Sequence, residues 1–136
     1  MLGTSYALTG ETTLPLADAV ARVREELKVE GFGVLTEIDV RATLKEKLDI
    51  DVEPYVILGA CNPPLAHQAL EAEPDLGVLL PCNVVVYERG GTTHVSAVDA
   101  ERMLSIVEND ALAGVAEDVR ARLVAVVDRV VTDEHI

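Results

Sequence analysis

The sequence predicts an α+β fold, a two-layer sandwich in which helices pack on one face of a mostly antiparallel or mixed sheet. Strand-like alternation and helix-like periodicity take turns in the first half of the chain. A strand pair joined by Gly90 and Gly91 then precedes a helical C-terminus. The chain has 136 residues, 49% of them hydrophobic, with no linker or repeat. Residues 1–136 are therefore expected to form a single domain.

The first half of the chain predicts two strands and two helices in alternation. Residues 6–12 alternate and carry threonines, which predicts an edge strand. Residues 15–30 place an apolar stripe along a helix, which a glycine ends. Residues 32–38 predict a second strand, and Asp39 is a typical N-cap for the short helix that follows. The apolar residues of that helix are Val40, Leu44 and Leu48.

An unbroken apolar run, Tyr55 to Ala60, predicts a central strand that is covered on both faces. Asn62 is expected to cap a helix that begins at Pro63 and ends before Pro74. Residues 76–80 are then expected to lead into the next strand.

The two-residue turn predicts a hairpin of residues 83–89 and 92–98 with a defined register. The expected pairs are Val86 with Val95, Val84 with Ala97, Cys82 with Asp99, and Tyr87 with His94. Even positions of the first strand then form the apolar face. The opposite face, which we interpret as a solvent-facing surface, a ligand wall or a subunit interface, carries Val85, Tyr87, His94 and Ser96.

Helices are expected to complete the chain. Asp99 is a suitable N-cap for a short helix through Glu108, and Asp110 opens a longer one with apolar residues at helical spacing. Residues 133–136 are expected to fray.

The charge balance excludes several partners. Acidic side chains outnumber basic ones by 24 to 11, which gives a formal net charge of −13. Nucleic acids and anionic membranes bind clustered Lys and Arg, so neither is expected as a partner. No apolar run reaches the ~18 residues of a membrane span, and the N-terminus lacks the features of a secretory signal. The expected location is therefore the cytoplasm.

The cysteines are the first candidates for chemistry. Cys61 lies between a strand end and a helix start, where free N–H groups and the helix dipole favour a thiolate or the anionic group of a ligand. Cys82 is expected on the core face as a buried thiol. Sheet pairing could bring together the two Cys-Asn dipeptides, Cys61-Asn62 and Cys82-Asn83. Their spacing is not a zinc signature and a site with His67 is a minor alternative, so no metal is predicted.

Glu37 and Lys45 are further polar candidates. Glu37 lies on a strand and Lys45 on the polar side of the next helix, so a contact between them is sterically allowed. The alternative is an ordinary surface ion pair worth under ~1 kcal/mol. The sequence contains no G-x-G-x-x-G, Walker, G-x-S-x-G or H-E-x-x-H pattern, and no cofactor is predicted.

Three segments, 31–39, 55–63 and 80–87, read GFGVLTEID, YVILGACNP and LPCNVVVY. In this order they resemble the domain-of-unknown-function family 302, and the resemblance covers nearly the whole chain. It implies a small α+β protein similar to family members that form homodimers, and it implies no reaction. Asp49 stands where the family often has glycine, which concerns only the end of the local helix. The recurrent family positions would be Glu37, Lys45, Cys61, Asn62, Cys82 and Asn83.

Three functional hypotheses follow. The first is a homodimeric module that binds a small ligand or effector in a pocket near the Cys61 helix start. Its ligand-binding residues would be Glu37, Lys45, Cys61, Asn62 and Asn83. The second is a thiol-dependent enzyme or redox protein that uses Cys61 with Cys82 as its partner, and the third is a pure interaction module. The first is preferred because no general base is aimed at either cysteine. Whether the protein is an enzyme stays open.

Overall fold

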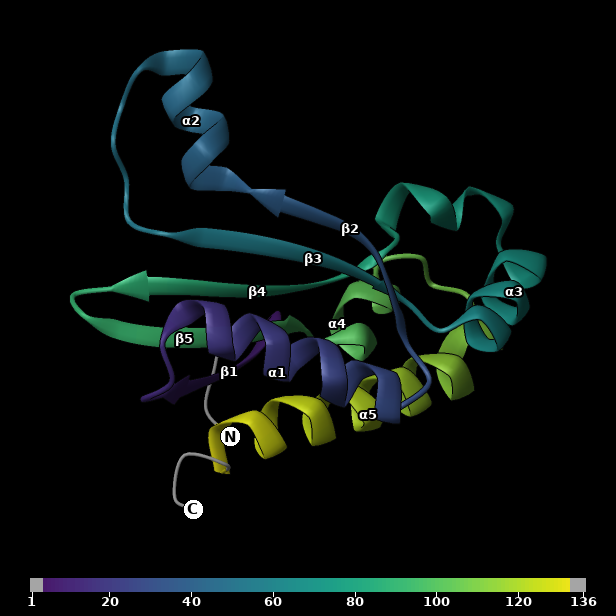
Figure 1. Cartoon of the computed structure of the whole chain (residues 1–136). Coiled ribbons are helices and arrows are strands. Elements are labelled where there is room, and N and C mark those ends of the chain that lie inside the picture. The colour runs from purple at the N-terminus through teal and green to yellow at the C-terminus, as the bar shows by residue number, and fades with distance from the viewer. Residues whose placement is uncertain (1–3, 133–136) are drawn as a thin grey trace.

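Five strands form one antiparallel sheet in the order β1-β5-β4-β3-β2, and helices cover one of its faces (Figure 1). A computed structural model describes residues 4–132, so the predicted fraying of 133–136 lies outside the described residues. The strands are β1 (Ala7–Thr12), β2 (Gly33–Asp39), β3 (Tyr55–Cys61), β4 (Cys82–Arg89) and β5 (Thr92–Val98). The helices are α1 (Leu16–Val29), α2 (Val40–Leu48), α3 (Pro63–Ala72), α4 (Ala100–Ser105) and α5 (Ala113–Thr132), with short 3-10 helices η1 (Pro74–Leu79) and η2 (Asp110–Leu112). The predicted α+β sandwich is confirmed.

Side-chain caps start three of the helices, as the sequence predicts. The side chains of Asp39, Asn62 and Asp99 accept hydrogen bonds from backbone N–H groups three residues later, at 2.9, 3.3 and 3.2 Å. Such bonds satisfy donors that the first turn of a helix leaves unpaired. At the other end of α2, Asp49 adopts the left-handed conformation, with φ +54°, and its N–H bonds to the Lys45 carbonyl.

The hairpin register is confirmed for three of the four predicted pairs. Val84 lies opposite Ala97, Val86 opposite Val95, and Tyr87 opposite His94. The prediction for Cys82 is wrong, because β5 ends at Val98 and Asp99 turns away to cap α4. The residue opposite Cys82 lies instead on β3 and is Ala60.

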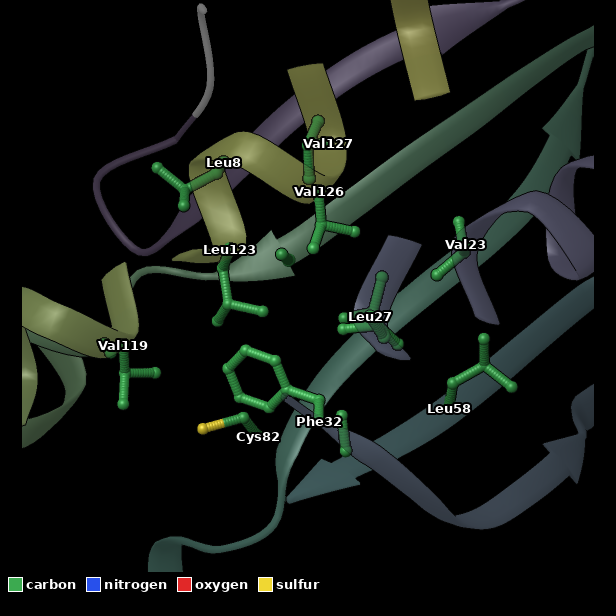
Figure 2. Close-up of a cluster of buried hydrophobic side chains, with 14 of the residues drawn as sticks. Leu8, Val23, Leu27, Phe32, Leu58, Cys82, Val119, Leu123, Val126 and Val127 are labelled. Atoms are coloured by element: carbon green, nitrogen blue, oxygen red, sulfur yellow. The ribbon is translucent and has the colours of Figure 1, made fainter. Parts of the chain in front are cut away.

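The core lies between the sheet and the two long helices, α1 and α5 (Figure 1). Figure 2 shows α1 and α5 side chains meeting those of the sheet around the ring of Phe32. Gly10 lets β1 approach α5 closely, because a Cβ at this position would overlap the Val131 side chain. The largest fully buried side chains include Leu27, Leu58, Leu76, Leu112, Leu123, Val84, Val86, Val95, Val126 and Val127.

The expectation that the apolar run of β3 is covered on both faces is only partly met. Val56, Leu58 and Ala60 are buried on the core face. On the other face Gly59 is buried against Thr36 and Pro81, whereas Ile57 is half-buried. The central strand of the sheet is β4. Residues 76–80 lead into β4 as expected, and most of them belong to the 3-10 helix η1.

An ion-pair cluster clamps α1 to α5. The Glu26 carboxylate is only 6% exposed and lies 2.9 Å from an Arg22 nitrogen and 2.5 Å from Arg129 Nε. A second nitrogen of Arg129 lies 2.6 Å from a Glu30 carboxylate oxygen. The clamp also holds the end of α1, since Arg122 Nη1 donates to the Glu30 carbonyl at 2.8 Å. A buried carboxylate requires such partners, because leaving it unpaired costs free energy.

Replacing Arg129 with Met should lower the free energy of unfolding by about 1–3 kcal/mol, because Glu26 loses a partner while it stays buried. The control is Arg24→Met, which removes an ion pair with Glu37 in which both side chains are 44% exposed. That control should cost under ~1 kcal/mol. Urea unfolding of the three proteins measures both losses. Equal losses would show that the clamp is no more than a surface ion pair.

Candidate functional site

The sheet face opposite α1 and α5, here called the outer face, carries a row of polar and aromatic side chains. Tyr55, Tyr87, His94 and Glu11 lie directly opposite one another on four adjacent strands. The two tyrosine rings stack at 5.2 Å, and the Tyr87 and His94 rings stack at 4.9 Å. His94 Nδ1 lies 3.9 Å from Glu11 Oε1. The row thus presents ring edges and polar atoms rather than ring faces near the hairpin end of the outer face.

A hollow of about 710 Å³, here called the outer-face hollow, lies beside this row. Its floor is the sheet, and α2 borders it through Val40 and Leu44. In Figure 1, α2 stands at the end of β2 and β3, away from α1 and α5. The hollow combines apolar walls with scattered hydrogen-bonding groups. Its lining includes Thr9, Glu53, Tyr55, Asn83, Val85, Tyr87, Glu88, Arg89, Ser96 and Val98.

Sequence reasoning identified part of this hollow. The hairpin register predicted that Val85, Tyr87 and Ser96 share a face, and all three line it. Tyr55 and the α2 residues were missed. Alternation within the apolar run of β3 could have found Tyr55, because it is two residues from Ile57 and falls on the same face.

Glu37 and Lys45 do not meet, so the contact that the sequence allows is not formed. Glu37 Oε1 accepts hydrogen bonds from Arg24 of α1 at 2.5 and 3.2 Å. Lys45 Nζ lies 3.0 Å from Asp49 and 3.6 Å from Asp51, at the far end of α2. Each charge is therefore satisfied locally on the surface. Neither residue lines the outer-face hollow.

The two asparagines have different surroundings. Asn62 is 7% exposed, and its side chain both caps α3 and donates to the Glu30 carbonyl at 3.4 Å. This amide holds three elements together, which is a structural role. Asn83 is exposed and lines the outer-face hollow, so it is the predicted ligand-binding residue that borders the larger space.

The cysteines end adjacent strands, as expected, but they occupy different register positions. Cys82 lies opposite Ala60 on the core face, and Cys61 is the next residue of β3. Both cysteines nevertheless border one small cavity. Burial raises the pKa of the Cys82 thiol to about 11, with a smaller contribution from Cys61. A thiol that stays protonated is a poor nucleophile, which does not favour Cys82 as a redox partner of Cys61.

The cavity near the start of α3 is small. Both cysteines border it together with Asn62 and Leu65, and its volume is about 50 Å³. His67 lies elsewhere, because it is exposed on α3 and pairs with Glu71 at 2.9 Å.

Among residues 4–132, no three His, Cys, Asp or Glu side chains gather in a way that could hold a metal ion. Within the same range, no helix has the length and apolarity to span a membrane.

Alkylation should distinguish the cysteines. Iodoacetamide should label Cys61 before Cys82 at neutral pH, because Cys82 is buried and its thiol stays protonated. Peptide mass spectrometry of the folded protein at increasing pH gives the two rates, and Cys82→Ala controls for cross-reaction. Equal rates, or an inert Cys61, would remove the support for Cys61 as a reactive residue.

The raised pKa of Cys82 should also make stability depend on pH. The unfolded chain releases this proton near the ordinary value of 9.0, and the folded protein releases it near 11. Below about pH 9 the thiol is protonated in both states and the free energy of unfolding does not depend on it. As pH rises from 9 toward 11, only the unfolded chain releases the proton, and the free energy of unfolding falls by up to about 2–3 kcal/mol. Urea unfolding at several pH values measures the decline. In Cys82→Ala the decline should be smaller, and an identical decline would contradict the burial of an ionisable thiol.

Two comparisons with known proteins agree with this architecture. A family model described as domain of unknown function DUF302 matches residues 8–130. A crystal structure titled as an uncharacterized conserved protein DUF302 from Bacillus stearothermophilus is similar to this chain, with 35% sequence identity and a TM-score of 0.87. The similarity covers 93% of this chain and 98% of that one. No match is found among curated proteins. The resemblance inferred from three sequence segments is thus confirmed, and the chain belongs to the DUF302 family.

Proposed function

We propose that the protein is a homodimeric module that binds a small organic ligand in the outer-face hollow. The volume of about 710 Å³ is the observation that carries this proposal, because ligand sites typically measure about 300–1,000 Å³. The lining supports it as well. Aromatic and aliphatic walls favour an apolar ligand body, and Asn83, Ser96 and the tyrosine hydroxyls offer hydrogen bonds that would orient it.

The other spaces support this function less well. The cavity near Cys61, where the sequence placed the ligand pocket, has a volume of about 50 Å³, which is too small for a metabolite. A surface hollow of about 410 Å³ lies along α4 and α5. Its wall carries four carboxylates and no aromatic side chain. Those carboxylates belong to Glu101, Glu108, Asp110 and Glu117.

Exposed apolar side chains on and beside β2 and α2 support a homodimer. Nine large hydrophobic side chains are exposed in the described part of the chain. Two of them lie on β2, two lie on or just after α2, and one lies just before β1. These five are Tyr6, Leu35, Ile38, Leu48 and Ile50. In addition, α2 has nine residues and buries no side chain. A helix this short is marginal on its own, so a second copy packed over α2 and the outer face would stabilise it.

The dimer should be sensitive to charge on the outer face. Light scattering coupled to size exclusion should report roughly twice 14.6 kDa for the unaltered protein at tens of micromolar. Ile38→Glu and Tyr87→Glu should shift the mass toward the monomer, because each would bury an unpaired charge. Val78→Glu is the matched control, because Val78 is an exposed apolar residue of η1, outside the hollow. A monomeric unaltered protein would contradict the homodimer, and a dimer in all three variants would contradict this interface.

Ligand binding can be tested without knowing the ligand. Native mass spectrometry of protein purified from its host should show a retained organic molecule. Val85→Trp should weaken or abolish retention because the larger ring projects from the floor into the hollow and obstructs it, whereas Cys61→Ser should preserve it. The same spectra give the oligomeric state of each variant, which separates loss of ligand from loss of dimer. Retention by Val85→Trp together with loss in Cys61→Ser would place the ligand near Cys61, and an empty protein would contradict the proposal.

A further inference from the structure

A second space, partly open to solvent, lies on the other side of the sheet. This space, here called the helix-side cavity, is bordered by the ends of β3 and β4 and by α3, η1, α4 and α5, and its volume is about 50 Å³. Figure 2 shows three of its wall residues, Phe32, Cys82 and Val119, within the buried cluster. The remaining apolar wall is formed by Ala60, Leu65, Ala66, Ala69, Leu76, Leu80, Pro81, Ala100, Met103, Leu104 and Val115.

The wall offers few polar groups, which are Cys61, Asn62 and Cys82. The Asn62 side chain has an acceptor bond from the Leu65 N–H and a donor bond to the Glu30 carbonyl. The Cys82 thiol is a weak donor, and burial keeps it uncharged at neutral pH because its pKa is about 11. A buried water needs two to four hydrogen-bond partners. The cavity therefore favours a guest that forms no hydrogen bonds.

The size of the cavity limits the guest. An engineered apolar cavity of about 150 Å³ stays dry and binds benzene or xenon. The helix-side cavity has about one third of that volume, which leaves room for roughly two to four heavy atoms. We propose that the helix-side cavity is a binding site for a small, uncharged, apolar molecule of this size, the class that includes dissolved gases. This site is separate from the outer-face hollow and does not depend on the function proposed there.

Short elements provide a route into the cavity. Two of its walls are α4 and η1, each of six residues. Short helices open locally at a lower cost than the long helices and central strands of a core. Met103 also belongs to the wall, and its flexible thioether side chain adapts to guests of different shape. A guest can therefore enter without unfolding of the sheet or of α5.

Xenon is the appropriate probe, because it is apolar and spherical. Methyl-labelled protein is titrated with xenon under pressure, and methyl resonances are followed by NMR. Methyl groups of Leu65, Leu76 and Met103 should shift saturably, whereas those of Val86 and Val95, which do not border the cavity, should not. Helium at the same pressure controls for compression. Uniform shifts over the whole core, no shifts, or water signals from within the cavity would each overturn the proposal.

Variants of α3 test the location of the site. Ala69→Val fills the cavity from its wall and should weaken apparent xenon affinity at least tenfold. Ala72→Val makes the same change at an exposed position of the same helix and should leave the affinity unchanged. Leu76→Ala enlarges the cavity and should strengthen the response, which keeps the test decisive if Ala69→Val does not fold. Undiminished binding by Ala69→Val, or weaker binding by Leu76→Ala, would overturn the proposal.

Discussion

The main constraint on this protein is that its long helices cover only one of the two faces of the sheet. α1 and α5 bury one face of β1, β3, β4 and β5, and the outer face is left half-buried, with aromatic and aliphatic side chains that α2 borders only at one end (Figure 1). Antiparallel sheets tolerate one solvated face when that face is polar. Here Ile57 and Val85 occupy its middle. The unpaired apolar surface is therefore the feature that a ligand and a second copy would each relieve.

The connections of the chain explain why α1 must be held firmly. β1 and β2 form opposite edges of the sheet, and α1 is the segment that joins them. A shift of α1 would thus displace both edges at once. The buried Glu26 carboxylate and its arginine partners fix α1 against α5, and Arg122 and Asn62 both donate to the Glu30 carbonyl, where α1 ends. Because α1 is fixed against α5, residues of the outer face can be substituted without loss of the fold.

Local patterns predicted the elements of the fold well, because caps, turns and alternation are properties of a few neighbouring residues. The Gly90-Gly91 turn fixed three cross-strand pairs, and Asp39 and Asn62 began the predicted helices. The errors involve longer distances. The run from Tyr55 to Ala60 is apolar at every position, which normally indicates two covered faces, but in this chain the second face is covered only in part. The partner of Glu37 is an arginine 13 positions away on α1, which no local pattern identifies.

The candidate site was predicted only in part. A sequence places Cys61 and Cys82 at the ends of two strands, so it suggests one shared pocket. In the folded chain the two cysteines do border one cavity, but its volume is only about 50 Å³. The residues predicted to bind a ligand are divided between two spaces, because Asn83 lines the outer-face hollow whereas Cys61 and Asn62 border the small cavity. The core face keeps a small apolar cavity beside a neutral thiol, and the outer face keeps the large, partly polar hollow, whose chemistry depends on residues from five different elements.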